Sequence, residues 1–214
     1  MATTRKALAV LIALLAGVGL LTGVAYVVGL SPFEKRGSID AGEVCESLGA
    51  SGKVIPALER VMPIKSRYSF NDEVNSRAHD SDDNYTSACF VRGDAQQIIS
   101  VRAEMMLIGP EPTQKTADGW ADDQIVANGP DKRPLKTFNA GNGAVASSRT
   151  SAILVPCTPP GQIPGGEYDL TVVVTLKQKS ESSDAKTRQS LIDLVRSAAE
   201  YAHKNARCDL PSKL

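Results

Sequence analysis

The pattern of hydrophobic and polar positions changes abruptly after residue 30. Residues 7–30 contain no charged side chain, whereas charged residues recur throughout the chain beyond them. As an α-helix this apolar run would be about 36 Å long, at roughly 1.5 Å per residue, and would cross a hydrocarbon core of about 30 Å. The run therefore predicts a single membrane-spanning helix that contacts the lipid bilayer, with residues 1–6 on the cytoplasmic side.

A cleaved signal peptide is the alternative interpretation of this run. The run is longer than the apolar core of about 7–15 residues in a secretory signal, and no A-x-A cleavage site follows it, so an uncleaved anchor is favoured. Gly19 and Gly23 form a G-x-x-x-G pair. Such a pair lets two membrane helices approach closely, which gives a hypothesis of weak self-association through this face.

Beyond the anchor we expect a short linker and one extracytoplasmic domain. Ser31 and Pro32 end the apolar helix, because proline lacks the backbone donor that a helix interior needs. The linker is expected at 31–39 and the domain at 40–210. Helical spacing of apolar residues predicts three helices in this domain, at 44–48, 53–62 and 184–207.

The expected strands are identified by alternation. Residues 98–107 carry apolar residues at every odd position and Ser100, Arg102 and Glu104 on the opposite face, a pattern typical of a half-solvated antiparallel strand. Residues 168–176 also alternate. Further strands are expected at 85–92 and 151–157, with shorter candidates near 68–70, 124–127, 135–138 and 143–149. The rest of 64–84 and all of 158–166 are interpreted as loops.

These elements occur in mirrored order in two halves of the domain. Residues 40–108 read helix, strand, strand, and residues 150–208 read strand, strand, helix. An antiparallel sheet with helices packed on one face accommodates this order. The expected fold class is therefore α+β.

The four cysteines, Cys45, Cys89, Cys157 and Cys208, all lie beyond the apolar run. Their number is even and no pair has C-x-x-C spacing, so two disulfides in an oxidising compartment are favoured over four buried thiols in a cytoplasmic domain. Four cysteines allow three connectivities. The preferred pairs are Cys45–Cys89 and Cys157–Cys208, because each would join a predicted helix to a strand of the same half.

Charge and aromatic content argue against a nucleic-acid partner. Residues 37–214 carry 20 basic and 23 acidic side chains, a net charge of −3. Binding to nucleic acid needs a basic face, and base stacking needs aromatic platforms, but aromatic residues make up only 5% of the chain. No nucleic-acid partner is predicted.

No pattern in the sequence reaches an active site, and no catalytic residue, cofactor or metal ligand is predicted. His79 and His203 lack metal-ligand spacing. Residues 80–84 begin like a calcium loop, but the sixth position is Tyr85 rather than glycine. Trp120, the only tryptophan, is expected to plug a core over a sheet, with a surface contact to a ligand as the alternative.

The end of the chain resembles a group of small proteins. A strand closes in Val155-Pro156-Cys157, a second strand follows, and an Ala-rich helix closes in Ala206-Arg207-Cys208. This layout is similar to membrane-anchored or secreted small proteins of Streptomyces-like actinobacteria with paired disulfides. The resemblance covers the layout of the C-terminal region, and it implies location and fold class but no activity.

The sequence predicts the location of the protein more firmly than its activity. We expect a single-pass protein of the cell membrane whose C-terminal domain is extracytoplasmic and binds an envelope protein or ligand without catalysis. The alternative is an envelope hydrolase whose carboxylates, with candidates Glu73, Asp80 and Asp122, meet only in three dimensions. A third hypothesis is a structural subunit of a larger membrane complex.

Overall fold

The computed structural model describes residues 36–108, 120 and 135–214. The chain divides into two compact units, residues 1–37 with 64–67 and residues 38–63 with 68–214. In the first unit, the Gly37 backbone N–H donates to the Lys65 carbonyl at 2.8 Å. The described residues include no helix that is long and apolar enough to span a membrane. The expected anchor at 7–30, with Gly19 and Gly23, lies outside the described residues.

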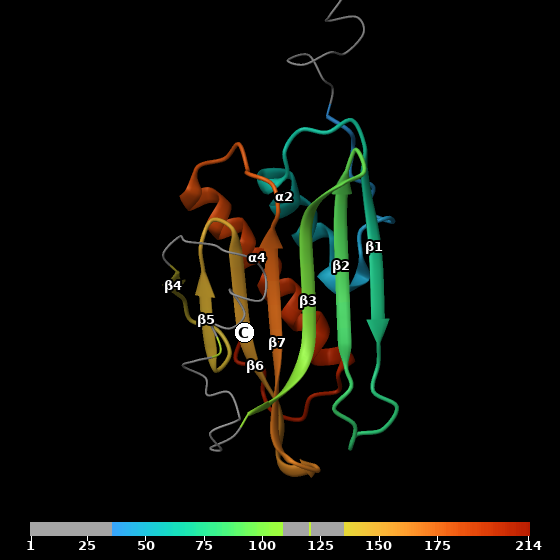
Figure 1. The fold of residues 1–214 in the computed structure, drawn as a ribbon, viewed down its shortest axis with the longest axis vertical. Helices are drawn as coiled ribbons and strands as arrows, with labels where there is room; N and C mark the ends of the chain where they lie inside the picture. Colours follow the sequence, from blue (N-terminus) through green and yellow to red (C-terminus); the bar gives the residue numbers. More distant parts are fainter. Residues whose placement is uncertain (1–35, 109–119, 121–134) are drawn as a thin grey trace, which may run out of the picture. The chain divides into compact units, whose positions relative to one another are not determined.

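The second unit has the predicted fold class, α+β. Its described elements form one antiparallel sheet of seven strands, with two α-helices and one short 3₁₀ helix (Figure 1). In chain order they are η1 (Glu46–Leu48), α2 (Ser51–Val61), β1 (Tyr68–Asn75), β2 (Thr86–Gly93), β3 (Gln96–Ile108), β4 (Lys136–Thr137), β5 (Gly143–Ala146), β6 (Thr150–Ile163), β7 (Gly166–Leu176) and α4 (Asp184–Asn205).

The sheet joins two hairpins through strands that are far apart in sequence. The strand order is β1-β2-β3-β7-β6-β5-β4, so the expected hairpins β2–β3 and β6–β7 meet where β3 pairs with β7. That pairing runs from Ile99 opposite Leu176 to Ile108 opposite Glu167. A long central ladder therefore connects the early and late parts of the domain.

The helices bury the apolar faces that their spacing predicted. In α2, Val54, Leu58 and Val61 are fully buried. In α4, whose first turn is capped by the Ser183 side chain accepting from the Lys186 N–H, the buried face includes Leu191, Leu194, Val195, Ala198 and Ala202. The helix α4 packs on β6 and β7 and contacts α2 and η1. Both helices lie behind the sheet in Figure 1, so the main core forms between this face and the helices.

Several expected boundaries were wrong. The helix expected at 44–48 is only the 3₁₀ turn η1, and the helix expected at 53–62 begins at Ser51, which places Pro56 in its second turn. The short candidates at 135–138 and 143–149 are the still shorter β4 and β5. The candidate at 124–127 lies outside the described residues.

Two stretches interpreted as loops are strands. The strand β1 continues to Asn75 although its second half is polar and exposed, because pairing with β2 supplies backbone hydrogen bonds without burying side chains. The strand β6 continues to Ile163 through Pro159 and Pro160. Its pairing with β5 ends at Leu154, so these prolines lie where β6 has β7 as its only described neighbour.

Both disulfides have the preferred pairing, Cys45–Cys89 and Cys157–Cys208, and no described cysteine is free. The first joins the residue before η1 to β2, and the second joins the chain just after α4 to β6. They close loops with sequence separations of 44 and 51. In the chain-entropy model, each loop of this length stabilises the fold by about 4 kcal/mol.

Candidate functional site

Strand register assigns the side chains of the sheet to two faces. On β3, Ile99, Val101 and Ala103 belong to the core shared with the helices. Arg102 and Glu104 lie on the opposite face and are exposed. We call this opposite side the outer face of the sheet.

The outer face over β5, β6 and β7 is apolar and is covered by Trp120. The indole is fully buried against a cluster of Val145, Ala152, Leu154 and Val173. Its Nε1–H donates to the Thr171 hydroxyl at 2.8 Å. Trp120 therefore plugs the core, and the alternative of a surface contact is wrong, because its apolar area and its one polar group are both satisfied inside the protein.

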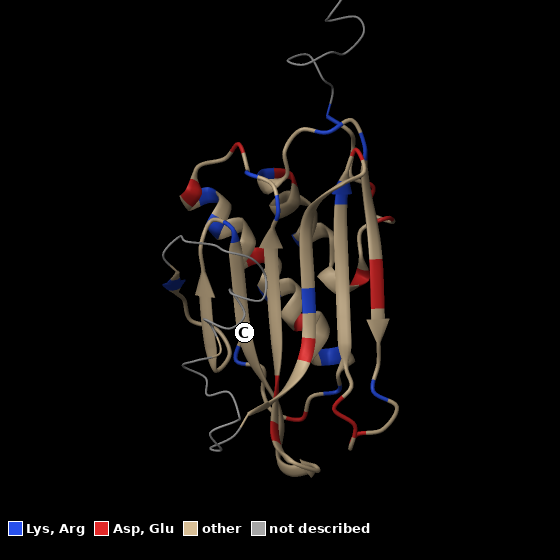
Figure 2. Ribbon diagram, viewed as in Figure 1, with Lys and Arg blue, Asp and Glu red and all other residues tan. Residues whose placement is uncertain are grey.

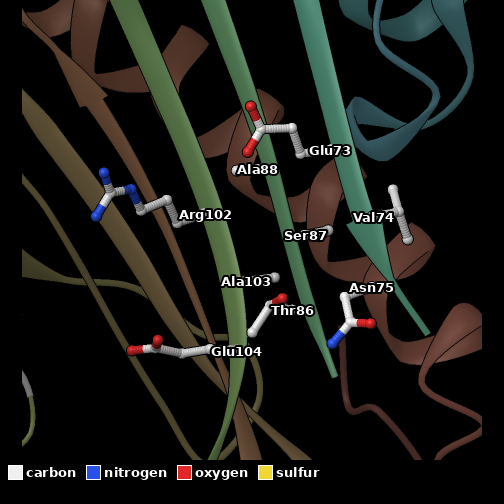
Figure 3. Close-up of a pocket in the computed structure, with 9 residues that line it drawn as sticks. All are labelled: Glu73, Val74, Asn75, Thr86, Ser87, Ala88, Arg102, Ala103 and Glu104. Carbon is white, nitrogen blue, oxygen red and sulfur yellow. The ribbon is translucent and has the colours of Figure 1, made fainter. Parts of the chain in front are cut away.

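The outer face over β1, β2 and β3 is polar and carries a shallow groove of about 290 Å³. Nine residues line it, and all nine are labelled in Figure 3: Glu73, Val74, Asn75, Thr86, Ser87, Ala88, Arg102, Ala103 and Glu104. They come from three adjacent strands, so the sheet itself forms the floor. This groove is the candidate functional site.

Register explains why the surface is hollow at this point. Glu73 pairs with Ala88, and Ala88 pairs with Arg102, so a methyl group separates two long charged side chains. Strands lie about 4.8 Å apart, which places the backbones of Glu73 and Arg102 about 10 Å apart across the groove. The small residue at the centre leaves the space that the groove occupies.

An aromatic neighbour contacts the guanidinium of Arg102. The Arg102 Cζ atom lies 5.8 Å from the centroid of the Phe90 ring, within the range of a cation–π interaction. Phe90 comes from β2 and is half-buried. The contact limits the freedom of a side chain that is otherwise exposed.

The sign of the charge changes along this face. Burial lowers the pKa of Lys177, and the positive charges of Arg102 and Arg149 lower it further, so three cations act on one region. Of the carboxylates in the groove, Glu73 lies across Ala88 from Arg102, and Glu104 lies two residues further along β3 than Arg102. Figure 2 shows the change on β3 as a basic band beside an acidic band. The site therefore offers both signs of charge to a ligand.

The two glutamates of the groove are widely separated. Glu104 lies two strands across and two residues along from Glu73, which places their Cα atoms about 12 Å apart. In Figure 3 the Glu73 side chain extends from β1 over β2, whereas the Glu104 side chain extends from β3 away from β2. Glycosidase carboxyl groups lie about 5–10 Å apart. Of the other candidates, Asp80 forms an ion pair with Arg207 at 3.4 Å, and Asp122 lies outside the described residues.

The acidic loop that resembles a calcium site surrounds an arginine. Arg77 is 4% exposed, and its guanidinium donates to the Asp80 carbonyl, to the Asp82 carbonyl at 2.7 Å and to the Ala206 carbonyl at 2.7 Å. It thereby fastens the loop between β1 and β2 to the end of α4. Among the described residues, no three His, Cys, Asp or Glu side chains are placed to hold a metal.

The two histidines lie outside the groove. His79 is exposed in the loop between β1 and β2, where its backbone N–H donates to the Asp82 carboxylate at 2.9 Å. The ring of His203 on α4 lies 2.8 Å from the Leu210 carbonyl oxygen. Among the described residues, the lining of the groove contains neither histidine nor cysteine.

Sequence alternation identified part of this site. It assigned Arg102 and Glu104 to a solvated face, but it did not join them to Glu73, whose strand was expected to end before that residue. Comparison with protein-family models, curated proteins and solved structures found no match. The resemblance to actinobacterial envelope proteins stays a prediction.

Proposed function

We propose that this chain is a membrane-tethered, extracytoplasmic binding module that takes a polar ligand on the outer face of β1, β2 and β3. The observation that carries the proposal is the division of the outer face. One half is covered by the buried Trp120, whereas the other half has a groove lined by one exposed cation, Arg102, and by exposed carboxylates. Ligand sites are typically concave, and a small number of placed polar groups gives them specificity.

Two features support the proposed location. Disulfides form and persist in oxidising compartments, and both pairs link the helix layer to the sheet. The apolar run at 7–30 has the length of a membrane anchor. A domain held at a membrane surface needs only weak contacts, because tethering raises the local concentration of an envelope partner.

The test compares charge variants of the full chain in detergent micelles. We expect Arg102→Ala to reduce the amount of envelope material captured on the immobilised protein, because it removes the cation beside the groove. Lys186→Ala is the matched control, since Lys186 is an exposed cation on α4 away from the sheet face. Equal capture by the wild type and both variants, or no capture above background, would contradict the proposal.

A second candidate function is an envelope hydrolase, because Glu73 and Glu104 line one groove. Their Cα atoms are about 12 Å apart, and the two side chains would have to turn toward each other to bring the carboxyl groups to the separation of about 5–10 Å that glycosidases have. Incubation of the full chain with peptidoglycan and envelope polysaccharide decides between the two. Release of fragments that is lost in Glu73→Gln and Glu104→Gln would favour the hydrolase.

A further inference from the structure

The outermost strand of the sheet is open over its second half. Within the part of the chain that the structure describes, no strand pairs with the outer edge of β1. Residues 71–75 are all exposed, on both faces of the strand. At the opposite side of the sheet, the outermost strand β4 has only two residues. The two edges of the sheet therefore differ in what they offer to another chain.

The strand β1 has only part of the usual protection of an exposed edge. Natural edge strands are shortened, bulged, or carry proline, charges (lysine above all) or an inward-pointing charge that prevents pairing with other chains. The strand β1 has eight residues, contains neither lysine nor proline, and pairs with β2 without a register shift. Its one core-side charge, Asp72, accepts from the Ser47 N–H at 3.2 Å and from the Ser47 hydroxyl.

The side chains along this edge indicate which residue types a neighbouring strand would carry. On the outer face, Glu73 stands at the rim of the groove. On the other face, Val74 is 42% exposed and is one of two large hydrophobic side chains, among those described, that are exposed to this degree. Opposite charges and β-branched pairs stabilise directly opposed residues of neighbouring strands. A complementary strand would therefore alternate basic and apolar residues.

We propose that Asn71–Asn75 of β1 binds an extended segment of a partner protein as an additional strand. A basic residue of that segment lies beside Glu73, and an apolar residue lies beside Val74. A second copy of this chain fits less well, because its β1 would add Asp72 and Glu73 to an edge that has no cation. The proposal rests on the proposed binding function and specifies its partner.

The test uses the full chain in detergent micelles and a labelled octapeptide that alternates valine and lysine. We expect the peptide to bind by fluorescence anisotropy and to slow hydrogen exchange at residues 71–75 but not in the central strand β7. The same peptide methylated on alternate backbone nitrogens keeps its charge but loses strand hydrogen bonds, so its affinity should fall at least about tenfold.

Two variants and a control locate the contact. Glu73→Gln should weaken binding of the unmethylated peptide about threefold at low salt, in line with an exposed ion pair. Val74→Lys should weaken it further, because it places a lysine on the edge opposite a cationic strand. Glu181→Gln, at an exposed acid before α4, should leave binding unchanged. Thermal melts of each variant establish that the fold is retained.

Three results would overturn this proposal. They are equal binding of the methylated peptide, unchanged exchange at 71–75, and protection of 71–75 that rises with protein concentration when no peptide is present, which would indicate self-pairing. If any of these occurs while envelope capture still depends on Arg102, only the strand-addition proposal fails. If capture is also independent of Arg102, the proposed function itself fails.

Discussion

The two halves of the outer face show how one sheet can be both core and surface. Over β5, β6 and β7, small and branched residues meet a buried tryptophan, and the strands are closed on both sides. Over β1, β2 and β3, the same face carries Glu73, Arg102 and Glu104 in solvent. Both halves share one helix layer behind them, so they differ in what lies over the outer face: buried apolar side chains on one half and exposed charges on the other.

The largest expected effect is on the half of the sheet over β5, β6 and β7, which Trp120 covers and which we call the closed half. Trp120→Ala should lower the free energy of unfolding by about 4 kcal/mol, because it leaves a cavity over Ala152, Leu154 and Val173. Urea unfolding of the full chain in micelles measures the change. Trp120→Phe keeps most of the packing and loses the bond to Thr171, so it should cost about 1 kcal/mol. A tryptophan variant as stable as the wild type would remove the basis of the comparison.

Removing one disulfide at a time tests whether the stability of each half depends on its own cross-link. Cys45→Ala with Cys89→Ala should cost up to about 4 kcal/mol, and Cys157→Ala with Cys208→Ala about the same, because the loops are of similar length. Urea unfolding again gives the values. A loss confined to one pair would show that the two halves are not equally dependent on these links.

We call the half over β1, β2 and β3 the open half. A buried tyrosine on its core side should make the free energy of unfolding depend on pH. Tyr85, just before β2, is fully buried, and burial raises its pKa to about 12, while the nearby Ser87 hydroxyl lowers it in part. The unfolded state loses this proton near pH 10 and the folded state keeps it until about 12. Its contribution, about 3 kcal/mol, is therefore complete below pH 10 and is lost as pH rises toward 12.

Comparison of the wild type with Tyr85→Phe isolates the contribution of the Tyr85 hydroxyl to the free energy of unfolding, since other groups titrate equally in both proteins. The stability difference between them should change between pH 10 and 12 and stay constant between pH 7 and 9. A constant difference across the whole range would show that the Tyr85 hydroxyl is not shielded from solvent, and that the open half is less closed on its core side than we infer.

The smallest expected effect is on the exposed side of the same half. Arg102→Ala should change the free energy of unfolding by less than about 1 kcal/mol, because it removes an exposed side chain and one cation–π contact with Phe90. The same urea series measures it. A loss comparable to that of Trp120→Ala would mean that Arg102 supports the fold rather than a ligand.

The sequence patterns predicted where the strands lie better than they predicted what packs against each face of a strand. Alternation at 98–107 correctly gave a strand with one solvated face. The same pattern at 168–176 gave a strand that is buried on both faces, because Trp120, which is remote in sequence, covers Thr171 and Val173. Periodicity describes which side chains share a face, and it contains no information on what later packs against that face.

The candidate site was less predictable than the fold. Glu73 reaches the groove because β1 pairs with β2 in one register, and a polar strand gives no alternation from which to read that register. The cysteines were more informative, since each preferred pair joins a helix to a strand of the same half. Arg77 was missed because an acidic loop suggests a cation from solution, whereas here the cation is supplied by the chain.

The central pairing of β3 with β7 imposes an order on biosynthesis. When the ribosome has released residues 1–108, β1, β2 and β3 are complete, but the strand that pairs with β3 along Ile99–Ile108 begins only at Gly166. In nascent chains, the edge of β3 that later pairs with β7 therefore stays open until most of the domain has been translated. Such non-local closure slows folding and exposes intermediates to aggregation, so we expect production of this protein to depend strongly on chaperone supply.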